Sequence, residues 1–293
     1  MAENASRNGM AFEYAVARAI ALNHGLQWVG EMKDKARARL AAYRKVPYQL
    51  QGQMDSAALR IANSWFIREK LFNRHGLKAD ADRRKCKVMV GDDAKNGDVR
   101  DITILRENDT IVDGISLKWS SPEIKCIRFG PNWGVSRYGW QLSREWHEAV
   151  GKWQNSMEGF ETYSEAIKRF GQFEVYGRLT RLIGDEFRRM VEADPLMSQR
   201  IASDIFGNQD YLKIVSEKQG EIIKGAVYIH RADKGYLVLT EERNRYLMFR
   251  FGTDWNLQAR LHNKDKALKI ANMSVSWSVR SWGREPWHAI APH

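Results

Sequence analysis

The hydrophobic pattern of this chain changes its period several times, and this alternation limits the possible folds more than any other feature. From Asn8 to about Asn23, good helix formers carry apolar residues at four-residue spacing, which predicts a helix. A second helix is predicted over residues 31–43. A third is predicted to begin after Asp55, which suits an N-cap, and to stop at Gly76. The first part of the chain is therefore expected to be helical.

Strand-like segments follow this helical part. Three are predicted between turn-prone residues, at Cys86–Val90, Asp101–Leu105 and Ile111–Trp119. Residues 141–206 return to a helical pattern, and residues 222–282 alternate apolar and polar side chains as strands do. Helices, a sheet, more helices and a second β-rich part together indicate an α+β or mixed α/β fold.

The charge of the chain points to a polyanionic partner. Its 293 residues include 47 Lys and Arg against 36 Asp and Glu, a formal net charge of +11. The surplus is concentrated between Arg243 and Arg284, where nine basic residues stand against two acidic ones. Such a surplus attracts nucleic acid and supplies phosphate contacts, although a ribosomal or membrane-surface protein could carry the same charge. The basic stretch is the first candidate for a DNA-facing surface.

The composition is that of a cytosolic globular protein. Two cysteines, Cys86 and Cys126, cannot form a disulfide framework, and no apolar run is long enough to span a membrane. The amino terminus lacks the layout of a signal peptide. We therefore expect a cytoplasmic protein without a membrane partner.

A possible catalytic constellation lies in the predicted strand pair. Asp101 opens one strand, and Ser116 and Lys118 lie on one face of the next because side chains alternate with period two. An antiparallel hairpin would place the carboxylate beside the ammonium. Carboxylate oxygens suit Mg²⁺, which activates water, and a lysine offsets charge on a phosphate. Taken alone the pattern is weak, since a lysine on an edge strand is usually a solvated charge.

The residues around this constellation resemble a nuclease core of the PD-(D/E)xK type, and more specifically the HaeIII family of type II restriction endonucleases. The resemblance is carried, in chain order, by Asn8–Ala15, Gly97–Ile102, Gly114–Lys118, Ile124–Gly134 and Trp255–Asn263. It thus spans most of the chain. It implies a central mixed sheet flanked by helices, with a β-rich C-terminal part.

The resemblance also implies an activity. This is Mg²⁺-dependent, site-specific cleavage of double-stranded DNA that leaves 5′-phosphate and 3′-hydroxyl ends, with GGCC as the target of the family's type enzyme. Asp101 would bind the metal, Lys118 would be the catalytic lysine, and Glu13 would be the acid from an early helix. A palindromic target would favour a homodimer or a monomer that acts twice.

The sequence departs from the usual core pattern at one catalytic position. The acid expected two residues before the lysine is replaced by Ser116, a weaker and uncharged ligand. Metal affinity would then have to come from Glu13, Asp98, Asp113 or Glu123. Asp98, in Asn-Gly-Asp, is more typical of a turn residue, and Asp113, next to Gly114, is equally interpretable as part of a bulge or turn. Trp119 and Ser120 also stand where His and Asn are expected.

The candidate residues for DNA binding lie near the catalytic strand and in the basic stretch. The candidates are Lys125, Arg128, Arg243, Arg260, His262, Asn263 and Arg280. Arginine and asparagine can read base edges or hold phosphates. The alternatives are a solvated helix start for Lys125 and Arg128, and a local strand-to-turn cap for His262 and Asn263. His262 has no ligand partner at zinc spacing, so zinc is not expected.

The expected organisation has three approximate parts, although one compact domain would also fit. These are a nuclease core with N-terminal helices at residues 1–140, a mainly helical segment at 141–215, and a β-rich basic DNA-recognition part at 216–293. Two other functions remain open. One is sequence-specific DNA binding without cleavage, and the other is a modification-dependent or repair nuclease.

Overall fold

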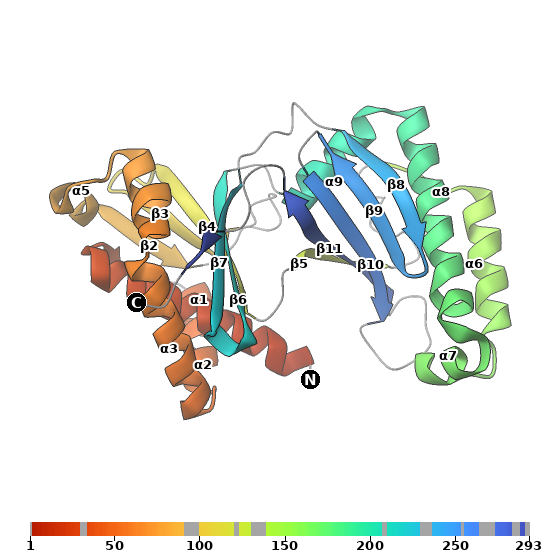
Figure 1. The fold of residues 1–293 in the computed structure, drawn as a ribbon, viewed down its shortest axis with the longest axis horizontal. Coiled ribbons are helices and arrows are strands. Elements are labelled where there is room, and N and C mark those ends of the chain that lie inside the picture. Colours follow the sequence, from red (N-terminus) through yellow and green to blue (C-terminus); the bar gives the residue numbers. More distant parts are fainter. Residues whose placement is uncertain are drawn as a thin grey trace. The chain divides into compact units, whose positions relative to one another are not determined.

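The computed structural model shows a mixed α+β protein with two compact units. The described residues are 2–29, 34–90, 100–119, 123–129, 139–206, 210–228, 236–252, 255–263, 273–282 and 288–290. The first unit comprises residues 1–122, 207–230 and 286–293, and the second comprises residues 123–206 and 231–285. Figure 1 follows the chain from one unit to the other and back. None of the helices in the described ranges is long and apolar enough to cross a membrane.

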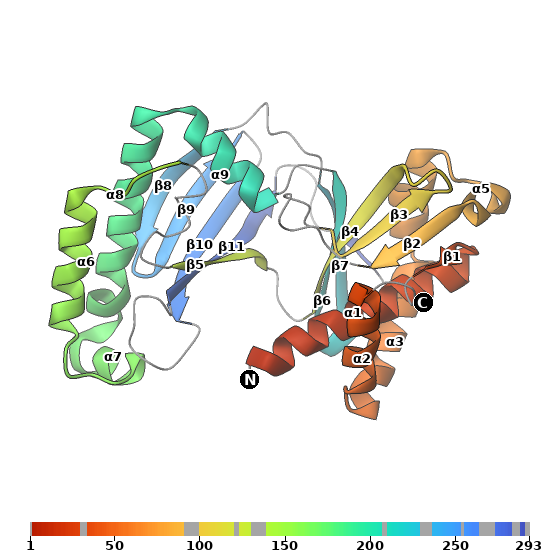
Figure 2. The ribbon, with the colours of Figure 1, turned by 180° about the vertical axis from the view of Figure 1, so that it is seen from behind.

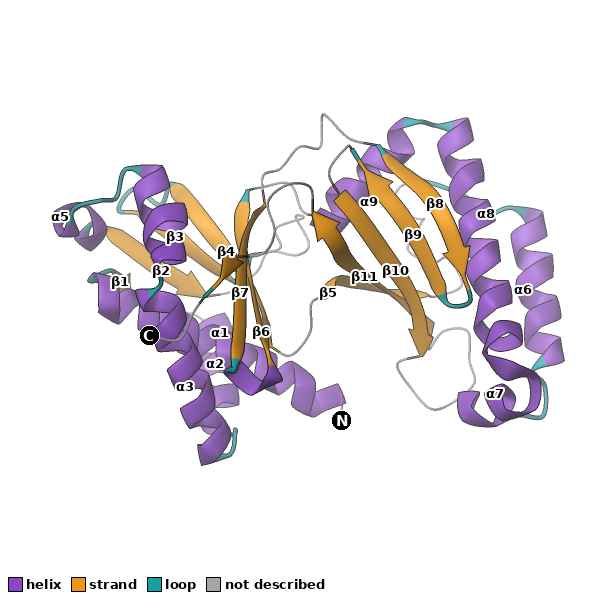
Figure 3. Ribbon diagram, in the orientation of Figure 1, coloured by secondary structure: helices purple, strands orange, loops and turns teal. Residues whose placement is uncertain are grey.

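The first unit is built on a mixed seven-stranded sheet in the order β1-β2-β3-β4-β6-β7-β12 (strands in orange, Figure 3). The strands are β1 Gln27–Trp28, β2 Cys86–Val90, β3 Ile102–Arg106, β4 Ile111–Trp119, β6 Tyr211–Glu217, β7 Ile222–Tyr228 and β12 His288–Ala289. β2, β3 and β4 form an antiparallel meander, and β6 pairs with β4 in parallel. The three strands predicted in this region are confirmed to within one residue at each end.

Helices from the amino-terminal part pack against this sheet (Figure 1). They are α1 Ala2–His24, α2 Asp34–Arg44, α3 Tyr48–Asn63, α4 Trp65–Ile67 and α5 Asp80–Arg84, with a π-helical turn at Arg68–Phe72 and a 3₁₀ turn at Asn73–His75. Phe12, Val16 and Ile20, the predicted stripe of α1, are fully buried in the core. This apolar stripe fixes the side of α1 that faces the sheet.

The predicted start of α3 is wrong. The helix begins at Tyr48, directly after Pro47, and Asp55 lies inside it. Its carboxylate accepts a hydrogen bond from the Tyr43 hydroxyl at 2.6 Å instead of capping the helix. The reason is burial, because Met54 is fully buried and extends the apolar stripe backwards past Asp55. The single helix predicted up to Gly76 is also interrupted, because α3 ends at Asn63 and Ser64 is extended. Gly76 ends the short helical turns that follow, where it adopts a left-handed conformation with φ of 74°.

The second unit combines helices with an antiparallel five-stranded sheet in the order β5-β11-β10-β9-β8. The strands are β5 Glu123–Phe129, β8 Leu237–Arg243, β9 Tyr246–Phe251, β10 Trp255–Asn263 and β11 Met273–Trp282. The helices are α6 Arg144–Ser156, α7 Tyr163–Gln172, α8 Arg178–Ala193 and α9 Leu196–Phe206. Figure 2 shows α8 and α9 beside this sheet. Phe187 of α8 packs its ring 5.0 Å from that of Phe249 on β9.

The two units do not follow the divisions expected at residues 140/141 and 215/216. β6, in the expected helical segment, and β7, in the expected C-terminal part, both pair into the first sheet. Residues 216–293 are rich in strands, as predicted. β5 is a strand, so the alternative of a helix start around Lys125 and Arg128 is wrong. It forms because β11, far along the chain, pairs with it.

Candidate active site on the first sheet

The carboxylate of Asp101 is fixed at the point where β3 begins. Ile102 pairs with Ile115 in the antiparallel β3–β4 ladder, and the Asp101 amide donates to the Ile115 carbonyl at 2.8 Å. The Leu117 amide in turn donates to Asp101 Oδ2 at 2.6 Å. These two bonds hold the side chain, which is only 8% exposed, beside the segment of β4 that carries Ser116 and Lys118. The predicted hairpin therefore brings these three residues together.

Glu13 reaches the same place from α1. The preceding residue, Phe12, packs its ring 4.7 Å from that of Trp119 at the end of β4. Burial, and then the nearby Asp101, raise the pKa of Glu13 to about 7, against the lowering effects of Arg39 and Lys118. The predicted acid of the early helix is thus within electrostatic reach of both predicted residues of the hairpin.

Two further cations complete the group, and the sequence analysis did not find them. Arg39 of α2 donates from Nε to Glu13 Oε2 at 2.5 Å, with both side chains nearly buried. Lys213 of β6 donates from Nζ to Ser116 Oγ at 3.0 Å and is 1% exposed. Burial and the neighbouring Lys118 hold the pKa of Lys213 well below its ordinary value, and Asp101 opposes them. A lysine inside the apolar run from Tyr211 to Val215 was the available signal.

The other acids that could replace the acid missing at position 116 do not join the group around Asp101 in the part of the chain that the structure describes. Asp113 is buried, accepts from the Gly114 amide at 2.7 Å and pairs with His75 Nε2 at 2.6 Å. Burial raises its pKa, and these two partners oppose the rise. Asp113 is therefore a structural acid of the hairpin. Asp98, the side chain of Glu123 and Ser120 lie outside what the structure describes.

The carboxylates around Asp101 can supply part of the coordination shell of Mg²⁺. Among the described residues, no three His, Cys, Asp or Glu side chains gather closely enough to hold a metal ion by themselves. Mg²⁺ usually takes one or two carboxylates and keeps several waters. The carboxylates of Asp101 and Glu13 interact electrostatically with each other and supply hard oxygens, so they fit such an ion. Asp98, also expected as a ligand, is outside the described residues.

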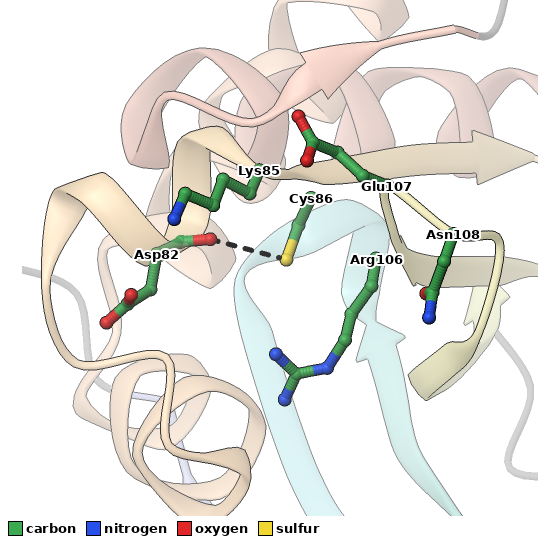
Figure 4. A pocket seen from close by; sticks show the side chains of 6 residues that line it. All are labelled: Asp82, Lys85, Cys86, Arg106, Glu107 and Asn108. Carbon is green, nitrogen blue, oxygen red and sulfur yellow. Dashed lines mark hydrogen bonds between the residues drawn. The ribbon is translucent and has the colours of Figure 1, made fainter.

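A cavity of about 370 Å³ lies at the opposite end of β3 from Asp101 (Figure 4). Its lining comprises Asp82, Lys85, Cys86, Arg106, Glu107 and Asn108. The Cys86 thiol donates to the Asp82 carbonyl at 3.6 Å, and burial raises the pKa of that thiol. The lining mixes both signs of charge and contains none of the residues gathered around Asp101. The cavity is therefore separate from the candidate active site.

The second sheet has one open polar face. On β9 and β10 the buried Leu247, Phe249, Leu257, Ala259 and Leu261 alternate with more accessible residues. We call the accessible set the open face of the second sheet, and it comprises Tyr246, Met248, Arg250, Asn256, Gln258, Arg260 and His262. The predicted Arg260 and His262 belong to it. His262 Nδ1 also contacts the Arg260 carbonyl at 3.4 Å.

For most of the remaining predicted DNA contacts, the structure gives the position in a strand but not the side chain. Arg243 ends β8, is exposed and pairs with Glu241. Asn263 ends β10, where it pairs with Met273 of β11, and Arg280 lies on β11. Lys125 and Arg128 lie on β5, opposite Trp277 and Ser274. The structure does not describe the side chains of these last four predicted residues.

A mixed sheet with an acid at the start of one strand and a lysine on the next is consistent with a restriction endonuclease fold. The sequence profile of HaeIII restriction endonuclease matches residues 9–230. The chain therefore belongs to the HaeIII restriction endonuclease family, which makes it a type II restriction endonuclease that acts on DNA. The match includes Glu13, Asp101, Ser116, Lys118 and Lys213. A comparison with curated protein sequences gives no match.

Proposed function

We propose that this protein cuts both strands of DNA at a specific sequence in a Mg²⁺-dependent reaction. The observation that carries the proposal is the gathering of Asp101, Glu13 and Lys118 at the β3–β4 hairpin. Two carboxylates and an ammonium on one patch are the groups that phosphodiester hydrolysis requires. The target GGCC is proposed from the family resemblance alone.

In the proposed mechanism each residue has a separate task. Asp101 and Glu13, with Asp98 as a further candidate, would hold Mg²⁺, which when bound polarises the phosphate and lowers the pKa of water. Lys118 orients the attacking water and offsets the negative charge that grows on the phosphate oxygens. A bond forms between the water oxygen and phosphorus while the bond to the 3′ oxygen breaks. That oxygen takes up a proton, which leaves 5′-phosphate and 3′-hydroxyl ends.

We assign DNA contact to the open face of the second sheet. The opposite face is buried and packs on α8 through Phe187 and Phe249, so it cannot bind a ligand. Arg250 and Arg260 on the open face supply positive charge, and Asn256, Gln258 and His262 supply hydrogen-bonding groups. Lys125, Arg128, Arg243, Asn263 and Arg280 are proposed contacts from the same sheet.

The test compares two buried aspartates of one hairpin. Purified wild type, Asp101→Asn, Lys118→Ala and Asp113→Asn are incubated with plasmid and phage DNA in Mg²⁺, with an EDTA control, and the fragment ends are sequenced. Wild type and Asp113→Asn should give discrete fragments sharing one end sequence. Asp101→Asn and Lys118→Ala should lose cleavage and keep DNA binding in a mobility-shift assay. Full cleavage by either of these two variants would contradict the assignment.

The same experiment separates the alternatives. Binding without cleavage is favoured by one observation, the serine that stands in the acid's place at position 116 and bonds to Lys213. Wild type that shifts DNA but leaves it intact in Mg²⁺ and Mn²⁺ would support that alternative. Cleavage of cytosine-methylated DNA only would indicate a modification-dependent enzyme. A palindromic end sequence would support the proposed homodimer, and we propose a cytoplasmic location for the enzyme.

A further inference from the structure

Lys213 occupies a position where a charge is costly. It lies in β6 between Leu212 and Ile214, which are fully buried in the core of the first unit, and its own side chain is 1% exposed. A buried ammonium lowers stability unless it is hydrogen-bonded and faces opposite charge. Its place in the strand is therefore explained only by what surrounds the ammonium group.

The surroundings of that group are the catalytic residues. The parallel register pairs Lys213 with Ser116 and Val215 with Lys118, so Lys213 lies next to the β4 segment that faces Asp101. Its Nζ donates to Ser116 Oγ at 3.0 Å, and its charge interacts with those of Asp101 and Lys118. One buried lysine thus contacts the serine that replaces the expected acid and also stabilises the aspartate across the hairpin.

We propose that Lys213 and Ser116 act as one positioning pair for DNA cleavage, in place of the acid that the usual pattern has at position 116. The hydrogen bond from Lys213 Nζ fixes the Ser116 hydroxyl and, with it, the stretch of β4 between Asp101 and Lys118. Because the Ser116 oxygen already takes part in this bond, we assign the metal to Asp101 and Glu13. This inference rests on the proposed cleavage activity.

The first arm of the test changes Lys213 to a residue of similar shape without charge. Lys213→Met should slow single-turnover cleavage at saturating DNA by about 10- to 100-fold, the usual effect of losing a group that orients a metal site. The dissociation constant for uncut DNA without Mg²⁺ should change less than about twofold. Ser216→Ala, a buried polar position on the same strand, is the matched control and should cleave as wild type does. Thermal unfolding checks that each variant is folded.

The second arm asks whether the two residues act together. Ser116→Ala should also slow cleavage. The double variant Ser116→Ala with Lys213→Met should be no slower than Lys213→Met alone, because either single substitution already removes the one interaction that the two residues share. Rate losses that multiply, or a folded Lys213→Met variant that cuts at the wild-type rate, would overturn the pairing alone. Wild type that cuts no DNA would overturn the proposed function and this inference with it.

Discussion

The effect of Arg39 on folding and its effect on the proposed cleavage, through Glu13, can be separated by substitution. It forms an ion pair with Glu13 in which the two side chains are only 10% and 13% exposed. Removing one partner of such a pair leaves the other group buried without a partner, and this lowers the free energy of unfolding more than replacing both groups does. The consequences for folding and for cleavage should therefore differ between single and double variants.

We expect Arg39→Met to lower the free energy of unfolding by about 2 kcal/mol or more and to slow cleavage. Adding Glu13→Gln should restore stability only at a pH well above the raised pKa of Glu13, where an unpaired carboxylate would otherwise be buried. Cleavage should stay impaired because a proposed metal ligand is lost. Arg37→Met on the same helix, where the side chain is 63% exposed, is the control and should change neither quantity. Urea denaturation and single-turnover cleavage measure the two effects. Recovery of cleavage in the double variant would contradict a role for Glu13.

At the residue scale, the sequence predicted the parts of the site that are local. Asp101, Ser116 and Lys118 come together because a hairpin and period-two alternation are short-range rules. Arg39 and Lys213 could not be found in this way. Lys213 bonds to Ser116 across 97 positions, and nothing in either strand specifies that β6 pairs beside β4.

The hairpin that holds Asp101 contains a close contact that requires glycine. A Cβ built on Gly114 would lie 2.1 Å from Cδ and 2.9 Å from Cβ of Arg100, whose side chain is 3% exposed. The Cβ of Arg100 cannot swing away as the end of a side chain can. Crowding at Gly114 must therefore move the backbone next to Asp101.

Gly114→Ala should lower the free energy of unfolding by about 1–3 kcal/mol through overpacking and should slow cleavage by displacing Asp101. Gly52→Ala provides the matched control. Gly52 lies in the interior of α3 with open space around its Cβ position, so this change should raise stability by about 0.5–1 kcal/mol and leave cleavage unchanged. Equal stability and equal cleavage in the two variants would show that the Arg100 contact does not constrain the hairpin.

At the element scale, elements with a strong internal period were predicted and those that depend on distant pairing were not. β4 carries its own pattern and has the predicted bounds, and α1 ends within one residue of the prediction but begins six residues earlier, at Ala2. β5 is a strand because it pairs with β11, and β6 because it pairs with β4. Asp55 was misplaced at a helix start because its local preference for a cap yields to the burial of Met54 one residue earlier.

The whole molecule carries a net charge of +11, and two of its positive charges, Arg250 and Arg260, lie on the open face of the second sheet. Arg250 on β9 is exposed on that face, whereas Arg144 on α6 belongs to the helices of the same unit and pairs with Glu148. Arg250→Ala and Arg144→Ala each remove one positive charge. Only a residue that contacts phosphate should change how DNA binding responds to salt.

We expect Arg250→Ala to weaken DNA binding and to reduce the slope of log K against log salt concentration by about 0.9, the value for one lost phosphate contact. Arg144→Ala should leave that slope unchanged. Fluorescence anisotropy with one duplex at several salt concentrations, without Mg²⁺, measures both. An equal change in the two variants would show that net charge, and not the open face, determines binding.

The order of strands also determines when, during synthesis, the proposed catalytic group can assemble. β4, which carries Lys118, has β6 as its neighbour, and all the helices described for the second unit are encoded between the two strands. During synthesis the ribosome must therefore release residues 120–210 before Lys213 can reach Ser116. Until then β4 is an open sheet edge, so a prematurely terminated chain would be prone to aggregate and would lack a complete catalytic centre. On the proposed role of Lys213, a chain that stops before β6 should therefore cut DNA poorly or not at all, because Ser116 lacks its partner.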